Sequence, residues 1–160
     1  MIYSEADDEL IKKLLTSTKT IAMVGVSSIK KEETTTNIIR RPSIIVMKYL
    51  QEFGYRVIPV NPFSVGKKIY GETVVAKLED INIPIDIVDV FRPSNEAPAL
   101  AKQVVKIQAK VLWLQYGIQN DEAKEIIKSK NITYISNKCI KQEYQRLFLK
   151  VSPVFPALKN

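Results

Sequence analysis

Small and hydroxyl-bearing residues follow the first apolar run of the chain. Gly25 ends a series of β-forming residues, and Ser27 and Ser28 come shortly after it. A glycine lets backbone amides approach an anion closely, and the start of a following helix adds partial positive charge. Nearby cations could neutralise such an anion: Lys30, Lys31, Arg40 and Arg41. The pattern is typical of a pyrophosphate cradle, and it equally fits a tight turn beside solvated cations.

The segment differs from the usual dinucleotide-binding pattern. That pattern needs three glycines at fixed spacing and, about 20 positions further on, an acidic residue that holds the ribose hydroxyls. Here one glycine is present, and the second β-forming run ends in Asn61-Pro62 without a carboxylate. A nicotinamide cofactor bound in the usual way is therefore disfavoured. A phosphorylated ribose would be repelled less, and Lys67 and Lys68 could reach one.

The chain contains no histidine and one cysteine, Cys139. Ser-His-Asp and Cys-His nucleophile pairs, zinc sites that need imidazole, and four-cysteine metal sites are therefore excluded. General acid–base chemistry near neutral pH would need a lysine, glutamate or cysteine with a shifted pKa. Cys139, between Lys138 and Lys141, is either a reactive thiolate or a half-buried structural thiol. These absences argue against a conventional hydrolase.

Hydrophobic periodicity divides the chain into alternating strands and helices. Apolar β-forming runs predict five strands, at 20–27, 55–60, 86–91, 109–115 and 132–135. Helical spacing predicts helices at about 4–17, 42–53, 95–108, 121–128 and 140–149. This alternation predicts an α/β fold: a three-layer, doubly wound (Rossmann-like) five-stranded parallel sheet, order 3-2-1-4-5, with helices on both faces. We expect one domain over residues 1–150, including the amino-terminal helix, and a carboxyl-terminal tail at 151–160.

In a doubly wound sheet the ligand crevice lies beyond the carboxyl ends of the strands, where the chain order reverses. The segments after the first three predicted strands should converge there, at 25–41, 61–71 and 92–95. Phe91 fits either the last core position of its strand or an apolar wall for a ligand. Arg92 could pair with a phosphate, or with the carboxylate of Asp89 or Glu96.

The composition is that of a globular protein, with 46% apolar and 26% charged residues and a net charge of +7. The excess charge lies in residues 102–160, which carry eleven basic and four acidic side chains. Such a balance favours an anionic partner: a phosphorylated small molecule, nucleic acid or an acidic surface. No apolar run approaches the length that spans a bilayer, so we expect no membrane association. The acidic amino terminus and single cysteine indicate a cytoplasmic protein.

Six segments of the sequence occur in the same order and at similar spacing in a known family. They are VGVSS, RRPSIIVMKYLQEFGYRVIPVNP, GETVVAKLEDI, PIDIVDVFRPSNEAP, AKVLWLQYGIQNDEA and CIKQEY. Over about residues 5–149 the chain resembles the Rossmann-type CoA-binding protein family, the stand-alone relatives of the CoA-binding domain of the succinyl-CoA synthetase alpha subunit. The synthetase reaction needs a histidine on a further domain. This chain has neither, so the resemblance does not extend to that reaction.

The resemblance implies coenzyme A or an acyl-CoA as the ligand. By position, Gly25-Val26-Ser27-Ser28 would hold the pyrophosphate, helped by Arg41 and Ser43 at the start of the next helix. Val60, Asn61 and Pro62 would flank the adenine and its ribose. Lys67 would lie near the ribose phosphate, and Phe91, Arg92 and Pro93 would line the course of the pantetheine arm.

Three functional hypotheses follow. The first is non-covalent binding of coenzyme A or acyl-CoA by a small cytoplasmic carrier, sensor or partner subunit without catalysis of its own. The alternative is a nicotinamide-nucleotide-binding oxidoreductase or redox sensor on the same fold. The third is a nucleic-acid-associated protein; it rests on the basic last third, but no helix-turn-helix, zinc finger or aromatic RNA-binding signature supports it. A weak homodimer through the last helix and a partner enzyme are both left open.

Overall fold

The computed structural model describes residues 6–26 and 42–149. Its centre is a parallel sheet of five strands: β1 (Thr20–Val24), β2 (Arg56–Val60), β5 (Ile87–Val90), β6 (Val111–Leu114) and β7 (Thr133–Ile135). The strands lie in the order β2-β1-β5-β6-β7, and every neighbouring pair is parallel. A small antiparallel hairpin, β3 (Lys68–Ile69) with β4 (Glu72–Thr73), follows β2 in the chain.

A parallel bridge between Val60 and Val75 adds one residue of strand on the outer side of β2. With this bridge counted as the third strand, the sheet has the expected doubly wound order 3-2-1-4-5, and β7 is added at the far edge. The expected fold class and order are thus confirmed, with one correction in the counting. The segment 86–91, counted third from the sequence, is the fourth strand and lies beside β1. A single paired residue leaves no period-two pattern, so the sequence does not indicate the bridge.

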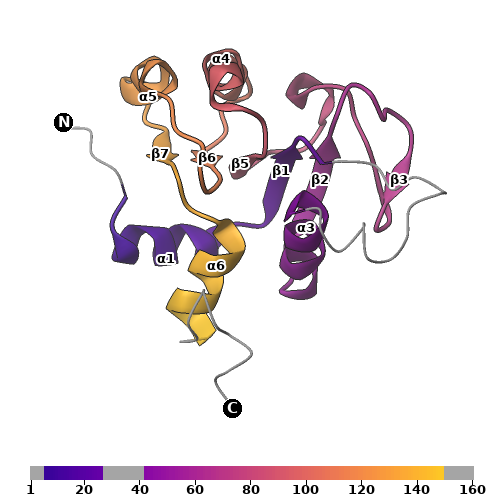
Figure 1. Cartoon of the computed structure of the whole chain (residues 1–160), viewed down its shortest axis with the longest axis horizontal. Helices are drawn as coiled ribbons and strands as arrows, with labels where there is room; N and C mark the ends of the chain where they lie inside the picture. The colour runs from indigo at the N-terminus through magenta and orange to yellow at the C-terminus, as the bar shows by residue number, and fades with distance from the viewer. Residues whose placement is uncertain (1–5, 27–41, 150–160) are drawn as a thin grey trace.

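Helices cover both faces of the sheet (Figure 1). On one face lie α1 (Asp8–Ser17), α3 (Pro42–Glu52) and α6 (Ile140–Tyr144), which continues into a π-helical turn, η3 (Gln145–Leu149). On the other face lie α4 (Ala97–Ile107) and α5 (Asp121–Lys128). Two short 3₁₀ turns, η1 (Leu78–Asp80) and η2 (Ser94–Glu96), precede β5 and α4.

The sheet separates two apolar cores. All five residues of β1 are buried, and they alternate between the two sides. Ile21 and Met23 belong to the core with α1, α3 and α6, whereas Ala22 and Val24 belong to the core with α4 and α5. A parallel sheet covered on both sides buries nearly all of its strand residues, which is why the strands read as largely apolar runs in the sequence.

Two helix starts differ from the sequence-based expectation. α1 begins at Asp8, and the carboxylate of Asp7 caps it by accepting the amide N–H of Leu10 at 2.9 Å. The stretch 95–96, expected as the start of a helix, belongs to η2, and α4 begins two residues later. Within η2 the hydroxyl of Ser94 accepts the amide N–H of Gln119 at 3.2 Å. The turn after β5 is thereby held against the turn after β6.

Asp89 is a fully buried acid in the middle of the sheet. It shares a face of β5 with Ile87, and its neighbours in register are Met23 and Trp113, so it faces the core with α1, α3 and α6. Neither carboxylate oxygen has a hydrogen-bond partner in the part of the chain that the structure describes. Loss of hydration therefore raises the pKa of Asp89 well above its ordinary value and favours the neutral acid in the folded protein.

We expect Asp89→Asn to stabilise the protein at neutral pH. The folded protein keeps a proton on Asp89 that the unfolded chain releases above about pH 4, so wild-type stability falls as the pH rises towards the raised pKa. The asparagine side chain does not titrate, so the free energy of unfolding of the variant does not fall in this way. The difference between variant and wild type should grow by about 1.4 kcal/mol per pH unit between about pH 4 and the raised pKa of Asp89. Urea denaturation of both proteins from about pH 4 to about pH 8 measures the difference. The same difference at every pH would contradict a neutral Asp89.

Candidate functional site

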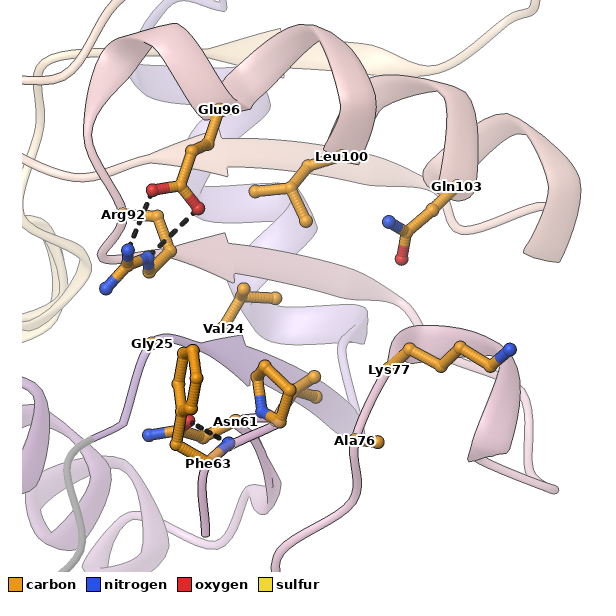
Figure 2. Close-up of a pocket in the computed structure, with 12 residues that line it drawn as sticks. Val24, Gly25, Asn61, Phe63, Ala76, Lys77, Arg92, Glu96, Leu100 and Gln103 are labelled. Carbon is orange, nitrogen blue, oxygen red and sulfur yellow. Dashed lines mark hydrogen bonds and ion pairs between the residues drawn. The ribbon is translucent and has the colours of Figure 1, made fainter. Parts of the chain in front are cut away.

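A pocket of about 250 Å³ lies beyond the carboxyl ends of β1 and β2 and faces α4 (Figure 2). Its lining comes from both strand ends, the segment after the β3–β4 hairpin, the turn after β5, and α4. The residues are Val24, Gly25, Val60, Asn61, Pro62, Phe63, Ala76, Lys77, Arg92, Glu96, Leu100 and Gln103. The expected convergence of the segments after β1, β2 and β5 is therefore found at the place where a doubly wound fold binds ligands.

Gly25 forms the turn that leaves β1. Its φ of +96° lies in the left-handed region that favours glycine. Its amide N–H donates to the carbonyl of Val60 at 3.0 Å. A Cβ at this position would lie 2.8 Å from Cδ of Arg92 and 3.2 Å from the carbonyl carbon of Phe91. Glycine is needed here both for the backbone conformation and for the space beside the turn after β5.

Asn61 joins the loop after β1 to the loop after β2. Its Nδ2 donates to the carbonyl of Val26 at 2.9 Å, and its Oδ1 accepts the amide N–H of Phe63 at 2.9 Å. Its own backbone N–H donates to the carbonyl of Val75, also at 2.9 Å. Both ends of the side-chain amide are used within the protein, so Asn61 sets the shape of the pocket.

Arg92 and Glu96 form a two-pronged ion pair at one end of the pocket (Figure 2). Nη2 and Nε of Arg92 donate to the two carboxylate oxygens of Glu96 at 2.7 and 3.1 Å. The hydrogen bond from Arg92 lowers the pKa of Glu96 and raises that of Arg92, so both stay charged at neutral pH. Their side chains are 44% and 43% exposed, and such pairs add little stability. Arg92 can therefore exchange Glu96 for a ligand anion at small cost.

An apolar side chain stands open to solvent on the pocket wall. Phe63 is 90% exposed, although its ring is large and apolar. Figure 2 shows this ring across the pocket from Leu100 and Gln103 of α4. Val24 and Val60 contribute further apolar lining. The pocket thus suits a flat apolar group at its centre and an anionic group towards Arg92.

The structure brings five of the predicted site residues together in the pocket lining: Gly25, Val60, Asn61, Pro62 and Arg92. It places five others elsewhere: the side chains of Val26 and Phe91 pack in the core with α1, Ser43 is buried in the first turn of α3, and Lys67 and Pro93 are exposed outside the lining. Ser27, Ser28 and Arg41 lie outside the described residues.

Sequence reasoning missed several lining residues. Leu100 and Gln103 are one helical turn apart on α4, and that spacing, together with the topology, could have placed them over the crevice. Ala76 and Lys77 reach the pocket because the chain returns past the end of β2 at the Val75 bridge. No sequence pattern indicates that the chain returns past the end of β2.

Two other kinds of site are absent from residues 6–26 and 42–149. No cluster of cysteine, aspartate and glutamate side chains in these ranges could hold a metal ion. None of their helices has the length and apolar character needed to cross a membrane.

The profile of the CoA binding domain matches residues 19–145, which include all five main strands and the whole pocket lining. The chain belongs to the CoA-binding domain family. This CoA-binding domain is similar to the protein YneT of Bacillus subtilis (strain 168), with 39% identity over 131 residues, 82% of this chain and 89% of that protein.

Solved structures show the same arrangement. The structure of cell-free ID.343 from Thermus thermophilus is 35% identical, with a TM-score of 0.78 over 89% of this chain and all of that one. A protein from Pyrococcus horikoshii OT3 is 34% identical, with a TM-score of 0.76 over 92% of this chain and 99% of its own. The dinucleotide forming acetyl-coenzyme A synthetase 1 of Ca. Korarchaeum cryptofilum, in its apo form, is 20% identical, with a TM-score of 0.57 over 74% of this chain and 26% of that chain. That last likeness shows the fold alone.

We expect Gly25→Ala to destabilise the protein more than Gly54→Ala. The two glycines have nearly equal φ values, +96° and +97°, so both variants incur a left-handed backbone cost of about 1–2 kcal/mol. A Cβ at Gly54 meets nothing within 4 Å, whereas one at Gly25 meets Arg92 and Phe91. Overpacking should add at least about 1 kcal/mol at Gly25. Urea denaturation compares the two variants, and equal losses would mean that the site has room for a side chain.

Proposed function

We propose that this CoA-binding domain binds coenzyme A or an acyl-CoA non-covalently and acts as a carrier, sensor or partner subunit without chemistry of its own. One observation carries the proposal. The pocket combines an exposed aromatic ring, a glycine turn packed closely against Arg92, and an arginine whose ion pair is exposed and exchangeable. These are the features that a nucleotide with a pyrophosphate and a long apolar arm requires.

The adenine ring lies against Phe63, with Leu100 on the opposite wall, where stacking and burial reward a flat aromatic group. The pyrophosphate lies towards Gly25 and takes the place of Glu96 on Arg92. Ser27, Ser28 and Arg41 add donors to that anion. The 3′-phosphate of the ribose is held by Lys67.

The described part of the pocket lining offers few side chains that could act as a nucleophile. None of the described lining residues is a serine, threonine, cysteine, tyrosine or aspartate, so the pocket offers no hydroxyl or thiol nucleophile there. The amide of Asn61 is occupied by Val26 and Phe63. A nicotinamide nucleotide is disfavoured because no carboxylate follows β2 to hold its ribose hydroxyls.

The proposal predicts that immobilised coenzyme A retains the protein and that free CoA releases it. NADH should compete poorly for two reasons. It has no pantetheine arm, and this protein has no carboxylate after β2 to bind its ribose hydroxyls. 3′-Dephospho-CoA should also compete poorly. The Lys67→Ala variant should bind CoA and 3′-dephospho-CoA equally well. Equal competition by both forms would remove the Lys67 contact. Absence of retention would reject CoA binding.

A second prediction concerns the ion pair. We expect Glu96→Gln to tighten CoA binding up to about fivefold, since exposed ion pairs are worth at most about 1 kcal/mol. The variant removes one negative charge from the pocket and frees Arg92. Glu125→Gln is the matched control, because it removes the same charge from an exposed pair with Lys128, outside the pocket. Calorimetric titration measures the affinities. Weaker binding by Glu96→Gln would show instead that Glu96 accepts a hydrogen bond from the ligand.

A further inference from the structure

A second cavity lies at the opposite end of the strands. This aromatic groove, of about 260 Å³, is lined by Leu15, Thr16, Thr18, Phe53, Gly54, Tyr55, Tyr144 and Phe148. Thr18 comes just before β1 and Tyr55 just before β2, so the groove lies at the amino ends of these strands. The pocket described above lies beyond their carboxyl ends. The two cavities share no lining residue.

The groove is built from a stack of aromatic rings around Tyr144. Its ring lies 4.8 Å from that of Phe53 and 4.7 Å from that of Phe148, measured between centroids. The ring of Tyr55 meets it edge-on at 6.1 Å. Phe53 is 40% exposed and Leu149, next to the stack, is 43% exposed. The described residues therefore leave Phe53 of the stack, and Leu149 directly after Phe148 in the chain, partly open to solvent.

The walls of the groove are held in place by charges. The guanidinium of Arg146 donates to both oxygens of Asp8 on α1, at 2.7 and 2.8 Å, and to Glu143 on α6 at 2.7 Å. The hydroxyl of Tyr55 donates to the carbonyl of Leu15. α1, η3 and the turn before β2 are thereby fixed to one another.

The chain itself supplies a segment with matching chemistry. η3 ends at Leu149, directly after Phe148 of the groove, and the sequence continues as VSPVFPALKN over 151–160. This segment contains Pro153-Val154-Phe155-Pro156, a Pro-x-x-Pro spacing. Such sequences favour the polyproline II conformation, which needs no internal hydrogen bonds, and they bind grooves lined by aromatic side chains.

We propose that the carboxyl-terminal segment 151–160 docks into the aromatic groove of its own chain. At about 3.1 Å per residue, Phe155 can lie up to about 19 Å from Leu149, which is ample for a groove that begins beside Phe148. A short tether also gives the segment an effective concentration in the millimolar range. A second copy of the chain would have to exceed that concentration to compete. We therefore expect the groove to be occupied by the segment of the same chain.

The test places a nitroxide label at the end of the segment. Asn160→Cys, in a Cys139→Ser background, gives one attachment site in the full-length protein. The amide signals of Phe53, Tyr55 and Tyr144 should lose most of their intensity to the label. Phe155→Asp should restore these signals, whereas Lys159→Gln, which changes the charge by the same amount, should leave them broadened. Circular dichroism checks that each variant is folded.

A mixture distinguishes the two sources of the segment. In the mixture, one protein is ¹⁵N-enriched and carries no nitroxide, and the other carries the nitroxide at natural isotope content. The observed amide signals can then be broadened only by a nitroxide on another chain. Docking within one chain predicts no broadening in the mixture. Broadening in the mixture would assign the groove to a second copy, and no broadening in the singly labelled chain would leave the groove without this occupant. Either result overturns the proposal.

Discussion

Three strand ends crowd together around Gly25, and the pocket depends on how closely they approach. The amide of Gly25 donates to Val60 on one side, and the amide of Phe91 donates to the carbonyl of Val24 on the other, at 3.0 and 2.9 Å. The side chain of Arg92 fills the space in which a Cβ on Gly25 would lie. Main-chain atoms thus form this corner of the pocket. A site built on backbone is already ordered before a ligand arrives, so less conformational entropy is lost on binding.

The two cavities divide the sheet between them. Loops after the strands form the ligand pocket, while the turns before β1 and β2, together with α6 and η3, form the aromatic groove. The ligand pocket is mixed in character, with Arg92, Glu96 and Lys77 beside apolar walls. Aromatic residues make up half of the groove lining, beside two threonines. The two cavities share no lining residue, so each can bind a ligand of a different chemical kind.

Much of the fold could be read from the sequence because strand burial on both faces produces unbroken apolar runs such as Thr20–Val24. The place of the pocket followed from topology, and its lining contains the predicted residues Gly25, Asn61 and Arg92. What the sequence left open was decided by contacts between distant segments. Arg92 had three candidate partners and took Glu96. The sequence around Phe63 does not indicate that this aromatic side chain, directly after Pro62, is exposed to solvent. Asp89, in an apolar strand, gave no sign that its carboxylate has no partner among the described residues.

The bridge at Val75 has a consequence beyond the pocket it helps to line. The outer side of β2 would otherwise be a bare edge, the kind of surface on which strands of other molecules add and fibrils grow. The amide of Val75 donates to Pro59 and its carbonyl accepts from Asn61, while Arg56 further along is paired with Glu72 of the hairpin. The opposite edge, β7, is only three residues long. The sheet is therefore closed to extension on one side and too short for it on the other, so concentrated solutions of this protein should stay free of cross-strand polymers.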